Sequence, residues 1–151
     1  MSVQTSAPAP TAFSKVVAAV VAALGTAPAV CDTIYRARPN VVPDQASFVV
    51  NVQMEGSRPT YGAIHGAPID WDTRVIVECF ARGMGDSGDV LVDPLLAAVY
   101  ARLAGDSTLG GLVDDFKCVD LEAENTSEGK KIGWVRLVYI AQQRTDNLIV
   151  T

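Results

Sequence analysis

A buried strand is predicted by the segment Ile69-Asp-Trp-Asp-Thr-Arg-Val-Ile-Val-Glu-Cys-Phe-Ala81, in which apolar and polar side chains largely alternate. Side chains of a strand point alternately to its two faces, so one face of this segment is mostly apolar and the other is mixed. The apolar face holds Trp71, Thr73, Val75, Val77 and Cys79, and the mixed face holds Asp72, Arg74, Ile76, Glu78 and Phe80.

A loop and a helix follow this strand. Gly83-Met-Gly-Asp-Ser-Gly88 is typical of a loop, and the helix is expected from about Asp89 or Asp93 to Ala104. Asp93 before Pro94 is a favourable N-cap and first-turn pair. The buried stripe of this helix is expected to be Leu95, Val99 and Leu103, with the turn Leu109-Gly110-Gly111 after it.

A closing hairpin is predicted from Phe116 to Asn125 and from Lys130 to Gln143. Apolar residues occupy both faces of its second strand, with Trp134, Val138 and Ile140 on one face and Val135, Leu137 and Tyr139 on the other. Such a strand is either central in its sheet or has one face covered by another subunit.

The N-terminal half completes an α+β domain. Residues 1–10 are rich in Pro and Ala and are expected to form a flexible arm. Thr11 can cap a helix that ends at Gly25. Short strands are expected over Thr33–Arg38 and Ala46–Met54, with a long connection from Glu55 to Pro68. We therefore expect one domain over residues 11–151, a mostly antiparallel sheet of about five strands packed by two main helices.

Composition and net charge disfavour several classes of function. The 151 residues carry a net charge of −5, which disfavours sequence-wide DNA binding. The apolar run Val16–Leu24 followed by Ala27-Pro-Ala29 has some features of a signal peptide, but its flank holds one cation, and the run is too short to span a membrane. Three widely spaced cysteines predict neither a disulfide framework nor a metal site and fit a reducing cytoplasm.

We predict that the chain is not an enzyme and holds no cofactor. His65 is the single histidine and has no catalytic partner at a recognisable spacing. The loop Gly83–Gly88 lacks the lysine of a phosphate-binding loop. The acidic row Asp120, Glu122 and Glu124 is better explained by ion pairs across the hairpin with Lys130, Lys131 and Arg136.

The order of these segments resembles the tail terminator (tail completion, minor tail protein U-like) proteins of long-tailed bacteriophages. The resemblance covers roughly Thr11 to Thr151 and rests on order and spacing. It runs through the first apolar helix and then through Ile34-Tyr-Arg-Ala-Arg38, Asp70-Trp-Asp-Thr-Arg-Val-Ile-Val-Glu78, Asp93-Pro-Leu-Leu-Ala-Ala-Val-Tyr-Ala-Arg-Leu103, Leu109-Gly-Gly-Leu112 and Arg144-Thr145.

The resemblance implies a structural virion protein of the tail and neck, assembled in the host cytoplasm. Such proteins form a homo-hexameric ring on the finished tail tube, stop its growth and present the head-joining surface. The implied partners are the tail tube protein and a head–tail joining (neck) protein, with no membrane. DNA passes through the lumen without specific binding. The resemblance implies no catalytic residues.

Two sets of residues are candidates for roles in such a ring. A subunit interface is expected where the last strand needs cover, at Arg74, Glu78, Trp134, Arg136, Val138 and Ile140. An acidic lumen would release DNA more readily than a basic one. Its candidate residues are Asp114, Asp115, Asp120, Glu122 and Glu124.

Other functions stay open at this stage. The chain could be a different neck or head–tail joining component of similar size. A small enzyme or ligand-binding domain is disfavoured, because polar groups do not converge in the sequence. We expect the arm of residues 1–10 to lie on a neighbouring subunit or on another tail or neck protein.

Overall fold

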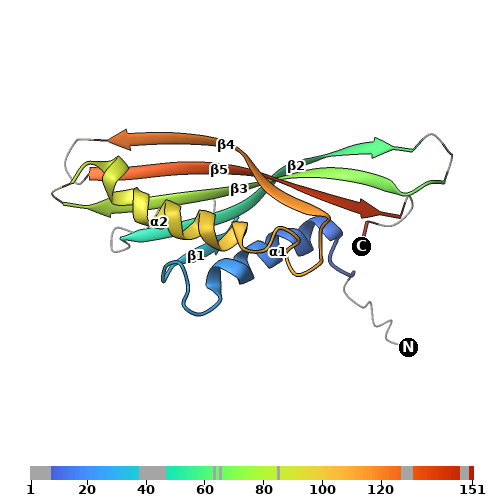
Figure 1. Ribbon diagram of the computed structural model, residues 1–151, viewed down its shortest axis with the longest axis horizontal. Helices are drawn as coiled ribbons and strands as arrows, with labels where there is room; N and C mark the ends of the chain where they lie inside the picture. Colours follow the sequence, from blue (N-terminus) through green and yellow to red (C-terminus); the bar gives the residue numbers. More distant parts are fainter. Residues whose placement is uncertain are drawn as a thin grey trace, which may run out of the picture.

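The computed structural model describes residues 8–37, 47–62, 64, 66–84, 86–126, 131–146 and 150–151. It contains two helices and one five-stranded sheet with the strand order β1-β2-β3-β5-β4. β1 pairs with β2 in parallel, and every other neighbouring pair is antiparallel. The predicted α+β fold with a mostly antiparallel sheet is therefore confirmed (Figure 1).

The first helix, α1 (Ala12–Gly25), begins and ends as predicted. The hydroxyl of Thr11 accepts a hydrogen bond from the Ser14 N–H at 3.2 Å, which satisfies one of the open N–H groups of the first turn. Its buried residues follow helical spacing and face the sheet: Val16, Val17, Val20 and Leu24.

The first two strands are β1 (Ile34–Arg36) and β2 (Phe48–Tyr61). The prediction of a connection from Glu55 to Pro68 is wrong, because β2 continues to Tyr61 and pairs with β3 (Ile69–Gly83) along its whole length. A register shift lies between Met54 and Gly56, and Pro59 lies on a part of β2 that β1 does not pair with. Proline is tolerated there, since an edge position needs no N–H donor. This hairpin extends beyond the helices (Figure 1).

The second helix, α2 (Gly88–Ala104), begins next to Asp89, the earlier of the two predicted starts, and ends at Ala104 as predicted. Its N-cap is Ser87 and not Asp93, and Pro94 lies inside the helix. A helix that starts at Gly88 has to approach β5 closely, because a Cβ added at Gly88 would collide with the backbone of Ile132. Its buried stripe includes the predicted residues Leu95, Val99 and Leu103.

The closing hairpin consists of β4 (Asp115–Thr126) and β5 (Lys131–Thr145). β5 lies between β3 and β4, which confirms that a strand with two apolar faces is central in this sheet. A register shift between Cys118 and Asp120 marks a bulge in β4. β4 is the last strand in the order and forms one edge of the sheet.

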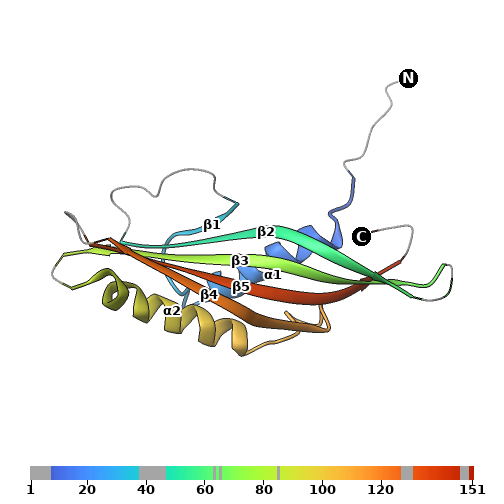
Figure 2. The same ribbon diagram turned by 90° about the horizontal axis from the view of Figure 1, so that it is seen from above.

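The main core lies between the two helices and one face of the sheet (Figure 2). Val75, Val77 and Cys79 of the predicted apolar face of β3 belong to this core, together with Val135, Leu137 and Tyr139 of β5. Phe116 stacks on Tyr139 with ring centroids 4.7 Å apart. Among the buried side-chain nitrogen and oxygen atoms of the described residues, the Tyr139 hydroxyl is the one without a hydrogen-bond partner. Burial raises the pKa of Tyr139 well above its ordinary value.

Polar contacts join the two helices at their C-terminal ends. The Arg102 guanidinium of α2 donates to the carbonyl oxygens of Ala23 and Thr26, each at 2.8 Å, and of Pro28 at 2.5 Å. Carbonyl groups at a helix C-terminus have no partner within the helix, so a cation is favourable there. Arg102 therefore holds the end of α1 beside α2.

The predicted Leu109-Gly-Gly turn has three successive residues with positive φ, at 49°, 74° and 86°. Glycine adopts such angles without steric cost, whereas Leu109 does not. The Asp106 carboxylate stabilises the turn by accepting from the backbone N–H groups of Thr108 and Gly110, at 3.1 and 2.7 Å. These bonds hold the pKa of Asp106 below its usual value.

Candidate functional site

The sheet has a second face, which points away from α1 and α2, and we call it the open face. Ile76 of β3 and Val138 of β5 are partners across the two strands on this face. They have exposed fractions of 0% and 1%, although neither belongs to the core beneath the helices. The open face therefore has a small apolar centre of its own.

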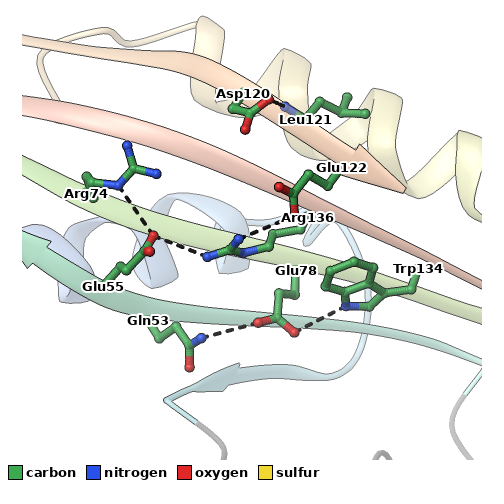
Figure 3. A network of polar contacts seen from close by, with 9 residues as sticks. All are labelled: Gln53, Glu55, Arg74, Glu78, Asp120, Leu121, Glu122, Trp134 and Arg136. Atoms are coloured by element: carbon green, nitrogen blue, oxygen red, sulfur yellow. Dashed lines mark hydrogen bonds and ion pairs between the residues drawn. The ribbon is translucent and has the colours of Figure 1, made fainter. Parts of the chain in front are cut away.

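A chain of charged side chains crosses the open face and involves all four long strands (Figure 3). Glu55 Oε2 accepts from Arg74 Nε at 3.4 Å and from an Arg136 guanidinium nitrogen at 3.2 Å. Another nitrogen of Arg136 contacts Glu122 Oε2 at 3.4 Å. One carboxylate thus bridges two arginines, and one arginine bridges two carboxylates.

A second group of contacts surrounds Glu78 (Figure 3). Its carboxylate accepts from Gln53 Nε2 at 3.3 Å and from the indole N–H of Trp134 at 3.2 Å. The indole bond holds the Trp134 ring over the sheet, because its donor is directed toward the neighbouring strand. Trp134 is half-buried as a result.

The charged chain contributes little to the stability of the fold. The side chains of Arg74 and Glu55 are 45% and 43% exposed, and Arg136 is 25% exposed. Exposed ion pairs contribute about 0–1 kcal/mol each, since water screens them and the side chains lose rotamer freedom. Such contacts can rearrange when another molecule packs on them.

The structure brings the predicted interface residues together on the open face. However, Arg74, Glu78 and Arg136 have partners within their own chain, and Val138 is already buried. The apolar surface that another subunit would need to cover is therefore smaller than predicted. The gathered set is Arg74, Glu78, Trp134, Arg136, Val138 and Ile140.

The predicted lumen residues lie on β4 or just before it. Asp120, Glu122 and Glu124 share the open face, as the alternation predicted, and all three are exposed. The expected ion pair across the hairpin forms between Glu122 and Arg136, while Lys130 and the side chain of Lys131 fall outside what the structure describes. Asp114 is exposed, and Asp115 lies 3.8 Å from Lys117. Whether these acids line a lumen stays a prediction.

The sequence did not indicate two residues of the open face. Glu55 was assigned to a loop, yet it is the carboxylate that links Arg74 to Arg136. Gln53 falls within the predicted strand Ala46–Met54, but nothing in the sequence indicated that it donates to Glu78. Gly56 and Pro59 concealed this part of the strand by marking a loop, and the register shift between Met54 and Gly56 breaks the simple alternation that would have placed Glu55.

Metal-binding side chains do not cluster in the part of the chain that the structure describes. The described residues contain no group of three or more His, Cys, Asp or Glu side chains that could hold a metal ion. The described cysteines, Cys31, Cys79 and Cys118, form no disulfide. Burial raises the pKa of Cys79 to about 12, so its thiol stays protonated at neutral pH. His65 lies outside the described residues.

Neither described helix is long and apolar enough to cross a membrane. A groove of about 610 Å³ lies between the C-terminal half of α1 and the segment after α2. Alanines 19, 22 and 23 line one side of it, and Arg102 and Asp106 line the other. The polar groups of both residues are engaged in the contacts given above, so this groove offers no converging donors for a ligand.

No family model matches the sequence, and no curated protein matches it. A chain from a structure titled "Virion of native gene transfer agent (GTA) particle" is similar, with a TM-score of 0.37 and 14% sequence identity. The match covers 89% of this chain and 92% of that chain. A TM-score this low does not establish a common fold or function.

Proposed function

We propose that this chain is a structural protein of a phage-like virion, and that it forms a ring that caps the completed tail tube. The ring stops tube growth and presents the surface that joins the head. Its partners are then the tail tube protein and a neck protein, and DNA passes through its lumen. The proposal places the chain in the tail or neck of the particle.

The observation that carries the proposal is the correspondence between the resemblance and the fold. The segments that resemble tail terminator proteins become, in order, α1, β1, β3, α2, the Leu109-Gly-Gly turn and the end of β5. Each of these segments except the turn forms a helix or strand that builds the two layers. The resemblance therefore rests on segments that form core elements of this chain and not on a short motif.

The surface of the chain also supports a structural role. Polar groups of the open sheet face, among them Glu55, Arg74 and Glu78, pair with one another within the chain. The net charge of −5 and the acidic β4 edge are compatible with DNA moving past without being retained. These features favour a building block of an assembly over an enzyme.

The decisive experiment is negative-stain imaging of particles assembled without this chain. We expect tails longer than normal, because nothing stops the growth of the tube. Tails of normal length without heads would instead identify a head–tail joining component. Normal, infectious particles would contradict both functions.

A complementary experiment measures the mass of the purified chain over a wide range of concentration. The proposal predicts a species of six copies, either in solution or after addition of tail tubes. Re-addition of the wild-type chain should restore tail length, whereas Trp134→Asp should fail. Circular dichroism of this variant separates a lost contact from a lost fold. A strictly monomeric chain that binds no tubes would contradict the ring.

A further inference from the structure

The sheet has an edge on each side where a strand of another molecule could pair. Among the described residues, β1 pairs with β2 at Val50–Val52, so the part of β2 from Gly56 to Tyr61 has β3 as its one described neighbour. On the other side, β4 is the last strand in the order and pairs with β5. Edge strands carry backbone N–H and C=O groups that can continue a sheet into a second copy. The outward N–H groups of β2 and β4 therefore influence whether copies can join through their backbones.

The bonds between β1 and β2 show which residues of β2 turn their backbone outward. The Val50 N–H donates to the Thr33 carbonyl oxygen at 3.0 Å, so Val50 turns its backbone toward β1 and away from β3. Backbone directions alternate along a strand, but the register shift between Met54 and Gly56 inserts one extra residue and reverses this alternation. Even-numbered residues of β2 therefore face outward before the shift, and odd-numbered residues face outward after it. Pro59 is one of these odd-numbered residues.

Pro59 lies near the middle of the open part of β2, in the hairpin that extends beyond the helices (Figure 1). A neighbouring strand would need an N–H donor there, and proline has none. Without the extra residue in β2, the missing N–H would face β3 and remove a bond of the β2–β3 ladder. The bulge and Pro59 therefore act together, because the bulge directs the residue without a donor to the outer edge.

The edge strand β4 loses an outward donor in a different way. The Gln142 carbonyl oxygen accepts from the Asp114 N–H at 2.8 Å, so even-numbered residues of β5 turn their backbone toward β4. Val138 is one of them and pairs with Asp120, so the next residue, Leu121, turns its backbone outward. The Leu121 N–H donates to the Oδ1 atom of Asp120 at 2.9 Å (Figure 3). The donor that a neighbouring strand would need is therefore already bonded within the chain.

Two further features of β4 oppose pairing with another strand. The bulge between Cys118 and Asp120 interrupts the regular spacing of donors and acceptors. Asp120, Glu122 and Glu124 are exposed along this strand, and two β4 strands side by side would bring such carboxylates together. Bulges and charged side chains at sheet edges are common means of preventing association between strands.

We propose that Pro59 and Asp120 are edge guards, meaning residues that keep copies of this chain from joining strand to strand. Pro59 removes an outward donor from β2, and Asp120 occupies an outward donor of β4. The inference goes beyond the proposed function and does not depend on it. It implies that copies in an assembly meet through their side chains, and that the five-stranded sheet is not continued from one copy into the next.

Two substitutions test the edge guards by restoring the outward donors. Pro59→Thr supplies an N–H in a residue that is favourable in strands, and Asp120→Thr frees the Leu121 N–H. We expect the double variant to associate at concentrations several-fold below those at which the wild-type chain associates, as measured by sedimentation velocity. Infrared spectra should show additional strand pairing between molecules as association proceeds. Each single variant opens one edge and should have a smaller effect.

Matched controls leave both edge guards in place. Glu124→Thr removes the same charge from the same strand and retains the bond between Asp120 and Leu121. Pro68→Thr removes a proline that lies between β2 and β3 and outside both strands. Neither control should associate more than the wild-type chain does. Pro59→Ala restores the N–H with less strand preference, and it replaces Pro59→Thr if circular dichroism shows that the threonine variant does not fold.

Amide hydrogen exchange measured by NMR shows which backbone groups form the new contacts. In Asp120→Thr at low concentration, the Leu121 amide should exchange faster than in the wild type, because it has lost its acceptor. In the double variant, protection of the amides at positions 59 and 121 should rise with protein concentration, since a second copy now bonds them. Protection of Leu121 in the wild type should not depend on concentration.

The proposal is overturned if the double variant keeps the association state of the wild type. It is also overturned if the double variant associates while the amides at positions 59 and 121 stay unprotected, because the copies then join through other surfaces. A wild-type assembly in which β2 or β4 pairs with a strand of a neighbouring copy would contradict it as well. Imaging of tails tests a separate point: tails of normal length without this chain would reject the capping function and leave the edge guards unaffected.

Discussion

The helix-covered face and the open face of the sheet both bury apolar side chains completely, but different groups cover them. Leu137 is buried under the apolar sides of α1 and α2, whereas Ile76 lies on the face crossed by Glu55, Arg74 and Arg136. The first cover is close-packed and cannot adjust without moving a helix. The second consists of long, half-exposed side chains that can move. The difference separates a face that determines the fold from a face that can accept a partner.

The largest effect is expected when one buried residue on each face of the sheet is truncated. This pair of variants compares the helix cover with the cover of charged side chains. Leu137→Ala should lower the free energy of unfolding by about 4 kcal/mol, because the helices cannot fill the cavity left behind. Ile76→Ala should cost only about 2 kcal/mol, since the flexible side chains above it can partly fill the space. Urea denaturation of both variants measures the difference. Equal losses would mean that the open face is as rigid as the core.

The next effect concerns the close approach of α2 to β5. A Cβ at Gly133 would collide with the Gly88 carbonyl oxygen. Gly133→Ala should therefore destabilise the chain by about 3 kcal/mol, because the helix start must move away from the sheet. Gly56→Ala is the matched control, since a Cβ there meets no atom within 4 Å. Thermal unfolding compares the two, and a harmless Gly133→Ala would show that α2 can shift freely.

A smaller effect, an increase in stability, is expected when a polar group is removed from the helix-covered face. Tyr139→Phe removes a buried hydroxyl for which the described structure shows no hydrogen-bond partner, and it retains the ring that stacks on Phe116. The variant should be more stable by about 1 kcal/mol, because the penalty for burying an unsatisfied polar group is lost. Calorimetry measures the change. A loss of stability would indicate that the hydroxyl has a partner in solution.

The smallest effect is expected on the open face itself. Arg136→Gln breaks the contacts to Glu55 and Glu122 and should change the free energy of unfolding by about 1 kcal/mol or less. High salt should reduce the difference between variant and wild type, because it screens exposed charges. Urea denaturation at two salt concentrations tests both points. A large, salt-independent loss would mean that the charged chain is part of the core.

The local sequence pattern was sufficient to predict several helices and strands and to place part of the open face. The alternation of β3 identified the residues that face the helices, because strand geometry leaves two orientations for each side chain. Thr11 and Gly25 marked the ends of α1, because capping depends on neighbouring residues alone. The same reasoning placed Trp134 and Arg136 on one face of β5. The sequence also predicted Val138 as an exposed-face residue but could not show that it is buried.

The elements that the sequence missed depend on contacts between distant segments. β2 continues through Gly56 and Pro59 because β3 supplies a partner along its whole length, and no local pattern reports that partner. The sequence left the start of α2 open between Asp89 and Asp93, and the helix begins at Gly88 because Gly133, far along the chain, leaves room for it. Glu55 becomes the bridge between Arg74 and Arg136 only when three strands lie side by side. Periodicity and capping are thus properties of the sequence alone. Strand partners, close approaches and charges shared between strands are decided by the tertiary structure, because their energies depend on distances between segments that folding brings together.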